Sequence, residues 1–423
     1  MKQRQLAKKR ILMISSDLLP NISANGVCVY NLAREYVRQG HQVYCIAAKQ
    51  PSQNDYEAID GIQIYRVKEA WFGRFQAKCM SRGKISRLWY SLIHLLRNIC
   101  LIPLYPNVSP IRALQVYRLA LKLVHEEHIA TVIGTFRPYE SIYTVLKLKQ
   151  KFGERLTCIS YYLDVLLQNQ PMQMGRSFYE RSSMRAQKND LRMLDRVIVP
   201  SSNKRDFEKL YGKNDNVEFL EFPMYIAASA KVEMSLPFHD DAIDMAYVGT
   251  LNQQDRNPEH LLELLTAVQK YLPNVCLHIW GKAEDVQDVL MHYPQLVQYH
   301  GYVSSECVTT ILQNADWVIN ITNKQNVNMV PSKIFQLFAS GKPILNYVFD
   351  RHDVSLPYFK RYENTYWVYD DEADSDATVT KLAEALQKTW PPVNADELFR
   401  ENMPEVVAGR VIGECDAEKW RED

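Results

Sequence analysis

The sequence predicts an α/β protein built from two doubly wound, Rossmann-like domains. The chain has 423 residues, and a domain usually takes about 100–200. Short apolar runs alternate with helical patterns along the chain, which favours parallel sheets made of βαβ units. This alternation stops between residues 222 and 244 and then restarts. We therefore expect a first domain at 1–222, a linker at 223–243, a second domain at 244–392 and a tail at 393–423.

The individual elements follow from the spacing of the apolar residues. In the first half we expect strands at 10–15, 42–47, 63–67, 131–134, 156–161 and 196–199, and helices at 26–39, 111–127, 139–152 and 177–194. In the second half we expect strands at 244–248, 275–280, 297–299, 317–321 and 343–346, and helices at 258–271, 283–292, 304–313, 332–339 and 377–389.

Composition and charge exclude several classes of protein. The net charge is +1, with 47% hydrophobic and 23% charged residues; this is typical of a globular protein and disfavours nucleic-acid binding by electrostatics. The eight cysteines have no CxxC or zinc-type spacing, so we expect reduced, buried thiols. No run approaches the roughly 18 apolar residues of a membrane span. We expect a cytoplasmic protein.

One segment, residues 70–125, qualifies that expectation. It contains no Asp or Glu, and basic residues alternate with Trp, Phe and Leu. This pattern suits a helix lying at the surface of an anionic membrane, so we expect peripheral contact with the inner face of the cell membrane. The alternative is a pair of core-packed helices with a solvated basic face. The basic residues are Arg74, Lys78, Arg82, Lys84, Arg87, Arg97, Arg112, Arg118 and Lys122.

Two loops that follow strands carry candidate anion-binding groups. Gly26 lies in a small-residue loop that leads into a helix, an arrangement that suits a phosphate, although a plain strand-to-helix turn explains it equally well. In the second loop, Gly249 and Thr250 end a strand and would let a ligand approach the main chain. Arg256 precedes a helix start and could pair with a diphosphate; the alternative is a surface arginine.

The third loop gives the strongest signal. Pro331 and Ser332 are expected to begin a helix, which Gly341 ends. Gln336 lies about one turn into that helix, where its amide could hydrogen-bond two sugar hydroxyls.

This third segment, PSKIFQLFASGKP, resembles the PSK(I/L)FEYLASGKP stretch of family 4 retaining GT-B glycosyltransferases, their variant of the E-x7-E donor-binding motif. The first strand and helix, the run VIVPSS at 197–202, and the pairs Trp280-Gly281 and His300-Gly301 also resemble the family. The resemblance spans about residues 10–390 and is weakest at 70–125. It implies the GT-B fold, with two Rossmann-like domains facing across a cleft and a tail that packs back on the first domain.

The resemblance also implies an activity: transfer of a sugar from a nucleotide sugar, with UDP slightly favoured, to a saccharide or lipid-linked acceptor in cell-surface polysaccharide synthesis. It implies retention of configuration, no protein nucleophile, no cofactor and no metal. The letters Asp-x-Asp do occur at Asp374 and Asp376, but in an acidic run that we interpret as a solvated loop.

On the donor side, the resemblance implies that Gln336 holds the ribose and Asn328 contacts the sugar. It also implies that the main chain at Val330, Pro331 and Ser332 meets the diphosphate, with Arg256 and Lys333 as cations. The donor residues thus implied are Gly26, Gly249, Thr250, Asn328, Val330, Pro331, Ser332 and Gln336.

On the acceptor side, Asp164 falls near the position of a His-Asp pair in the family, with Tyr161 or Tyr162 in place of the histidine. Arg137, after a strand end, is a further acceptor-side candidate. Both glutamates of E-x7-E are amides here. This departure favours a catalytically silent partner subunit as an alternative. The basic segment 70–125 leaves a membrane-associated scaffold open, and an epimerase or phosphorylase on the same fold is a third alternative.

Overall fold

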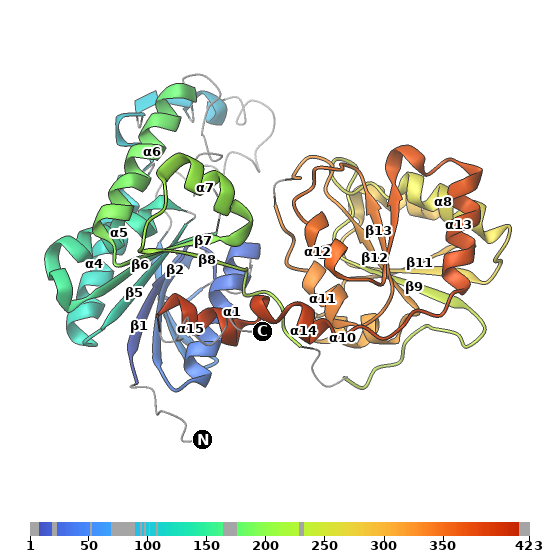
Figure 1. Ribbon diagram of the computed structural model, residues 1–423, viewed down its shortest axis with the longest axis horizontal. Helices are drawn as coiled ribbons and strands as arrows, with labels where there is room; N and C mark the ends of the chain where they lie inside the picture. Colours follow the sequence, from blue (N-terminus) through green and yellow to red (C-terminus); the bar gives the residue numbers. More distant parts are fainter. Residues whose placement is uncertain are drawn as a thin grey trace. The chain divides into compact units, whose positions relative to one another are not determined.

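The computed structural model describes residues 8–18, 23–50, 53–68, 89–93, 95–96, 99–100, 102–106, 109–136, 138–163, 176–227, 232–327 and 329–413. The chain divides into two compact units (Figure 1). The first comprises residues 1–224 and 401–423, and the second comprises residues 225–400. Each unit is a sheet covered by helices on both faces.

The first unit is built on an eight-stranded sheet with the order β3-β4-β2-β1-β5-β6-β7-β8. Its strand pairs are parallel except β3–β4. The strands are β1 (Arg10–Ile14), β2 (Gln42–Lys49), β3 (Tyr56–Ile59), β4 (Ile62–Lys68), β5 (Thr131–Phe136), β6 (Thr157–Tyr162), β7 (Arg196–Pro200) and β8 (Val217–Leu220).

Two pairs of helices cover this sheet, as Figure 1 shows. Helices α4 and α5 pack against alternate strand residues such as Leu12 and Ile14. Helices α1 and α15 pack on each other, where the Tyr36 hydroxyl donates to the Ala408 carbonyl at 3.1 Å. The described helices are α1 (Ala24–Arg38), α4 (Pro110–Glu126), α5 (Tyr139–Phe152), α6 (Arg176–Met193), α7 (Lys204–Tyr211) and α15 (Pro404–Val411), with the 3-10 turn η1 at Ile102–Leu104.

The second unit has a six-stranded parallel sheet with the order β11-β10-β9-β12-β13-β14. Its strands are β9 (Ile243–Val248), β10 (Val275–Trp280), β11 (Val297–Gly301), β12 (Trp317–Ile321), β13 (Ile344–Val348) and β14 (Thr365–Tyr369). Its helices are α8 (Glu259–Gln269), α9 (Gln287–Met291), α10 (Ser305–Asn314), α11 (Ile334–Ala339), α12 (Leu356–Arg361), α13 (Asp376–Gln387) and α14 (Ala395–Leu398).

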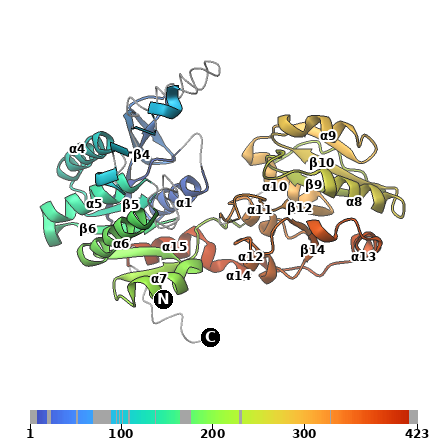
Figure 2. The ribbon, with the colours of Figure 1, turned by 90° about the horizontal axis from the view of Figure 1, so that it is seen from above.

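Alternate residues of these strands face opposite layers, as the two-residue period of a strand requires. Met245, Tyr247 and Leu277 point into a core shared with α8 and α13. Helices α10 and α11 pack on the sheet from the other side, and both layers can be followed in Figure 2.

All the predicted strands and helices are present, but several elements were not predicted. Strand β14 was missed, as were β3, β8, α7 and α12. β3 pairs only with β4, and none of its four residues is buried, while α12 is only six residues long. Short elements that depend on tertiary pairing leave little periodicity in a sequence.

The linker expected at 223–243 is not a free connection. The chain leaves the first unit after Met224, and residues from 225 onward belong to the second unit. There the Val232 amide donates to Thr310 Oγ1 at 2.9 Å and the Phe238 ring lies 5.0 Å from that of His278. From residue 401 the tail belongs to the first unit, where Arg196 donates to the Arg410 carbonyl at 2.8 Å.

Candidate functional site: two fixed cations at the switch point of the second sheet

The second sheet has its topological switch point between β9 and β12. From β9 the chain continues outward through β10 and β11, and from β12 it continues the other way through β13 and β14. In open α/β sheets, ligands bind beyond the carboxyl ends of the strands at this point. Here those ends lead into two loops, residues 249–257 after β9 and residues 322–329 after β12.

Asp255 ties the two loops together. Its Oδ1 accepts the Gln325 amide at 2.8 Å and its Oδ2 accepts Asn326 Nδ2 at 3.0 Å. Its carbonyl accepts the Lys324 amide at 2.9 Å. Burial alone would raise the pKa of Asp255, but the Asn326 and main-chain donors hold it below its usual value. The carboxylate is therefore committed to holding the loops in place.

Arg256, the next residue, is fixed by a neutral partner. Its Nε donates to Asn323 Oδ1 at 2.8 Å. Asn323 is buried at 1% exposure and in turn donates to the Asn326 carbonyl at 3.1 Å. The guanidinium is therefore oriented by an amide, and the carboxylate of Asp255 acts on it only through its charge and not as an ion-pair partner.

Lys333 supplies the second cation. Its Nζ lies 3.1 Å from the Tyr247 hydroxyl, to which it donates, and 4.6 Å from the centre of the Tyr247 ring. Burial, and then the charge of Arg256, hold the pKa of Lys333 well below its usual range. No carboxylate of the described part of the chain forms an ion pair with Lys333 or Arg256. Two neighbouring cations that have no ion-paired carboxylate favour an anion.

Tyr247 orients the ammonium group. Burial raises its pKa to about 12, with Arg256 acting in the opposite direction, so the phenol stays neutral at pH 7. Its hydroxyl donates to the Thr250 carbonyl at 3.0 Å. With its proton engaged there, the oxygen offers its lone pairs to Lys333.

Two glycines bring the main chain close to these groups. A Cβ added to Gly249 would lie 2.8 Å from Lys333 Nζ and 3.2 Å from the Tyr247 hydroxyl. A Cβ on Gly281 would lie only 1.9 Å from the Gly249 carbonyl oxygen. Glycine at both positions therefore allows the ends of β9 and β10 to approach each other and the ammonium group.

The third loop differs from its prediction in detail. Helix α11 begins at Ile334, with Lys333 as its N-cap, and not at Pro331. Val330 is buried, while Pro331 and Ser332 are half-buried in the turn before the helix. Gln336 is exposed on α11. Asn328 lies outside the described residues.

The first unit places its candidates differently from the prediction. Gly26 lies in the first turn of α1, and its amide donates to Ser23 Oγ at 3.2 Å, so the helix cap already uses this N–H. Tyr162 is buried at 1% exposure and donates to Asp190. Its hydroxyl is therefore engaged inside the core of the first unit. Arg137 and Asp164 lie outside the described residues.

Tyr247, Asp255 and Asn323 were not predicted as site residues. One signal could have found them. Asp255 and Asn323 are polar residues that follow neighbouring strand ends at a switch point, where side chains from distant parts of the sequence meet. Finding them required the strand order, which the sequence alone does not give.

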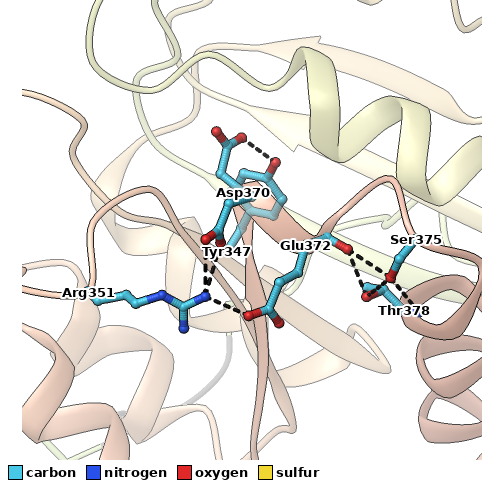
Figure 3. A network of polar contacts seen from close by, with 7 residues as sticks. Tyr347, Arg351, Asp370, Glu372, Ser375 and Thr378 are labelled. Atoms are coloured by element: carbon cyan, nitrogen blue, oxygen red, sulfur yellow. Dashed lines mark hydrogen bonds and ion pairs between the residues drawn. The ribbon is translucent and has the colours of Figure 1, made fainter.

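The acidic run before α13 is exposed at Asp371, Glu372, Asp374 and Asp376, as expected of a solvated loop, and it also makes local polar contacts. Asp370 accepts the Tyr347 hydroxyl at 2.6 Å, and Arg351 pairs with Asp371 at 3.0 Å and Glu372 at 2.5 Å (Figure 3). The Ser375 side chain caps α13 through the Thr378 amide. These contacts give the carboxylates a structural role at the end of β14.

No protein-family model and no curated protein matches the chain, but solved structures share its fold. The apo form of the lipopolysaccharide outer core galactosyltransferase WaaB aligns with a TM-score of 0.56 at 14% identity, covering 96% of this chain and 98% of that one. Sucrose-phosphate synthase from Thermosynechococcus elongatus gives 0.54 at 13%, covering 97% and 96%. A structure described as trehalose-6-phosphate from E. coli bound with UDP-2-fluoro glucose gives 0.53 at 10%, covering 98% and 97%. The chain has the GT-B fold.

Proposed function

We propose that the chain is a glycosyltransferase that moves a sugar from a nucleotide-sugar donor to a saccharide or lipid-linked acceptor. The observation that carries the proposal is the pair of cations, Lys333 and Arg256, held without an ion-paired carboxylate at the switch point of the second sheet. A nucleoside diphosphate supplies the missing negative charge. The GT-B fold is shared with a structure bound with UDP-2-fluoro glucose. This likeness supports a nucleotide sugar as the ligand that brings the diphosphate, and UDP as its nucleotide.

Each group would stabilise the charge that develops as the donor bond breaks. The ammonium of Lys333 and the guanidinium of Arg256 meet the departing diphosphate, and fixed charges of this kind stabilise a transition state without reorganising. Gly249 and Thr250 let the phosphates approach the main chain, as do Val330 to Ser332. Gln336 holds the ribose through its exposed amide.

The reaction that we propose retains the configuration of the sugar. The acceptor hydroxyl attacks on the face from which the diphosphate leaves and passes its proton to a leaving phosphate oxygen. The protein contributes position and charge, not a nucleophile or a metal ion. Asn328 contacts the donor sugar, and Asp164 and Arg137 of the first unit serve the acceptor.

We also propose that the first unit binds an anionic membrane surface, where a lipid-linked acceptor for cell-surface polysaccharide synthesis would be found. Residues 89–93, 95–96 and 99–100 are helical. Trp89, Leu92, Leu96 and Ile99 recur three and four residues apart in the sequence, and their side chains are 46–60% exposed. Exposed apolar residues within the acid-free, basic stretch of 70–125 suit a lipid interface. Among the described helices, none is both long and apolar enough to cross a bilayer.

Vesicle binding tests the membrane proposal. The double variant Trp89→Ser/Leu96→Ser should lose sedimentation with vesicles of anionic phospholipid, because it removes two exposed apolar anchors. Tyr302→Ser is the matched control, since Tyr302 is 79% exposed on the second unit. Equal sedimentation of the wild type and the double variant would contradict the proposal.

Calorimetric titration tests the donor site. UDP, GDP, ADP and TDP, and then their sugars, are titrated into the pure protein, and hydrolysis or transfer of the bound sugar is followed. Binding of one nucleotide that depends on Lys333 and Arg256, together with transfer, supports the proposal. Binding without any turnover would favour the silent partner subunit that the amides Asn328 and Gln336 also suggest. Binding of none of them would contradict the donor site.

A further inference from the structure

A second cluster of chemically reactive groups lies on the other face of the second sheet. Cys276 of β10 is the register partner of Asp244 of β9, and His278 follows two residues later on the same face of β10. One ligand atom from each of these three residues lies within 4.8 Å of the other two. Alternate residues of a strand point to opposite faces of the sheet, so Tyr247, three residues after Asp244 on β9, points into the other layer, next to Lys333. The cluster is therefore separate from the donor site.

The cluster is buried and already oriented. His278 is 0% and Asp244 2% exposed, and burying a carboxylate is costly unless a positive or hydrogen-bonding partner meets it. His278 Nε2 lies 2.8 Å from Asp244 Oδ1, and His278 Nδ1 lies 3.0 Å from His300 Nε2. Asp244 Oδ2 accepts the His239 amide at 2.7 Å.

Aromatic rings hold the histidines in position. The His300 ring stacks on the ring of Trp280 at 4.5 Å and on that of His278 at 5.3 Å. The Phe238 ring stands edge-on to the rings of both His278 and Trp280, at 5.0 Å and 5.9 Å. A histidine whose second ring nitrogen is fixed by a partner presents its first nitrogen in one direction, which is how histidines that bind metals are usually held.

We propose that Asp244, Cys276 and His278 bind a divalent transition-metal ion, and that the ion is zinc. A carboxylate oxygen, a thiolate sulfur and an imidazole nitrogen form a donor set that zinc takes in tetrahedral sites. Water completes the coordination. The three ligands come from two neighbouring strands, so the sheet itself fixes their spacing.

Binding changes the protonation of two ligands. The thiol of Cys276 releases its proton, and the ion takes the place of the proton between His278 Nε2 and Asp244. The single ring proton of His278 then lies on Nδ1 and is donated to His300 Nε2 at the observed 3.0 Å, and the ring proton of His300 lies on its own Nδ1. No other reactant is needed.

The position of the cluster assigns the ion a structural role. Asp244 lies near the beginning of β9, whereas Gly249 and Lys333 lie beyond its end. The segment 232–239 is held over the cluster by the His239 amide and the Phe238 ring. An ion bound to Asp244 and His278 fastens that segment to the sheet, so we expect it to raise stability and to leave nucleotide binding unchanged.

Metal titration of the untagged, chelator-treated chain tests the proposal. Co²⁺ should give one site per chain with a thiolate-to-cobalt absorption band, displaced by Zn²⁺, and Zn²⁺ should raise the melting temperature. Cys276→Ser should abolish the thiolate band, and His278→Gln should weaken binding by about tenfold or more. Cys307→Ser is the matched control, because Cys307 is equally half-buried on the same unit, and it should behave as the wild type.

The wild-type spectrum alone decides the matter if a variant fails to fold. Absence of a thiolate band, or a band that Cys307→Ser removes and Cys276→Ser does not, would overturn the proposal. UDP titration with and without chelator separates the two sites. If Lys333→Met loses UDP binding but still binds cobalt, the metal site is independent of the donor site, as proposed.

Discussion

Replacing Lys333 by methionine should weaken nucleotide binding and stabilise the free protein at the same time. Methionine keeps the length and the apolar contact with the Tyr247 ring but removes the charge. In the free protein the ammonium has a hydroxyl and a ring as partners and a second cation nearby. Because burial and Arg256 lower the pKa of Lys333 in the folded state, the unfolded chain holds this proton more tightly. The charge therefore costs stability at neutral pH, and the cost disappears only as the pH rises toward the usual lysine value.

The size of the binding effect follows from the contact that is lost. A hydrogen bond to a charged group contributes about 1.5–3 kcal/mol, and each 1.4 kcal/mol changes a dissociation constant about tenfold. Lys333→Met should therefore raise the Kd for the preferred nucleoside diphosphate about 10- to 100-fold. At a pH above the lowered pKa of Lys333, nucleotide binding by the wild type should also be coupled to proton uptake, because the diphosphate raises that pKa.

Three measurements check this reasoning. Calorimetry in buffers of different ionisation enthalpy reports the Kd and the protons taken up, and urea unfolding reports the stability of the free protein. Lys381→Met is the matched control, since Lys381 is exposed on α13 and the change in net charge is the same. The reasoning is refuted if Lys333→Met binds the nucleotide as the wild type does. It is also refuted if the free variant is less stable than the wild type.

Three further predictions concern stability. Gly281→Ala should lower the free energy of unfolding in urea by about 2–4 kcal/mol, because its Cβ would lie 1.9 Å from a backbone oxygen at a φ of 126°. Gly341 has open space around it at a φ of 72°, so Gly341→Ala should lower the free energy clearly less, and equal losses would count against the packing argument. Burial raises the pKa of Asp190 from 3.8 to about 7, so between these pH values the folded state holds more protons than the unfolded chain. The free energy of unfolding should therefore fall as the pH rises through 7, by on the order of 4 kcal/mol over the interval. Asp190→Asn should flatten that pH dependence in urea unfolding at pH 5 and pH 8, and an unchanged slope would disprove this assignment. Asn320 donates to Asn346 at 2.7 Å, but Asn320 Oδ1 and Asn346 Nδ2 are buried without partners. Replacing either residue alone by valine should therefore lower the free energy of unfolding more than replacing both. Additive losses in the double variant would argue against a coupled pair.

Much of the fold could be predicted because its strands and helices are long and strongly periodic. β10 and β12 have the bounds that the apolar runs 275–280 and 317–321 indicate. α5 likewise begins and ends at the predicted residues. The elements that were missed, such as β14, form only where a neighbouring strand supplies the pairing. The order of the strands, which creates the switch point, does not follow from local periodicity.

The candidate site could be predicted only in part. Arg256 and Lys333 were identified from strand-end position and family resemblance, and the structure brings them together near Gly249. Tyr247 was treated as an ordinary strand residue, because no local pattern shows that its hydroxyl meets a lysine 86 positions later. Tyr162 was assigned to the acceptor side, but its partner Asp190, on a helix 28 residues away, draws it into the core.

The path of the chain between the two units decides which fragments can be expressed. The second unit is one uninterrupted stretch, residues 225–400, whereas the first is assembled from 1–224 and 401–423. A gene truncated after residue 224 would encode the first sheet without α15 and would expose the side of α1 that carries Tyr36, which is fully buried in the intact chain. The second unit can be excised with two cuts, whereas the first must be joined by a bridging peptide from residue 224 to residue 401. Fragment studies of the donor site should therefore begin with 225–400.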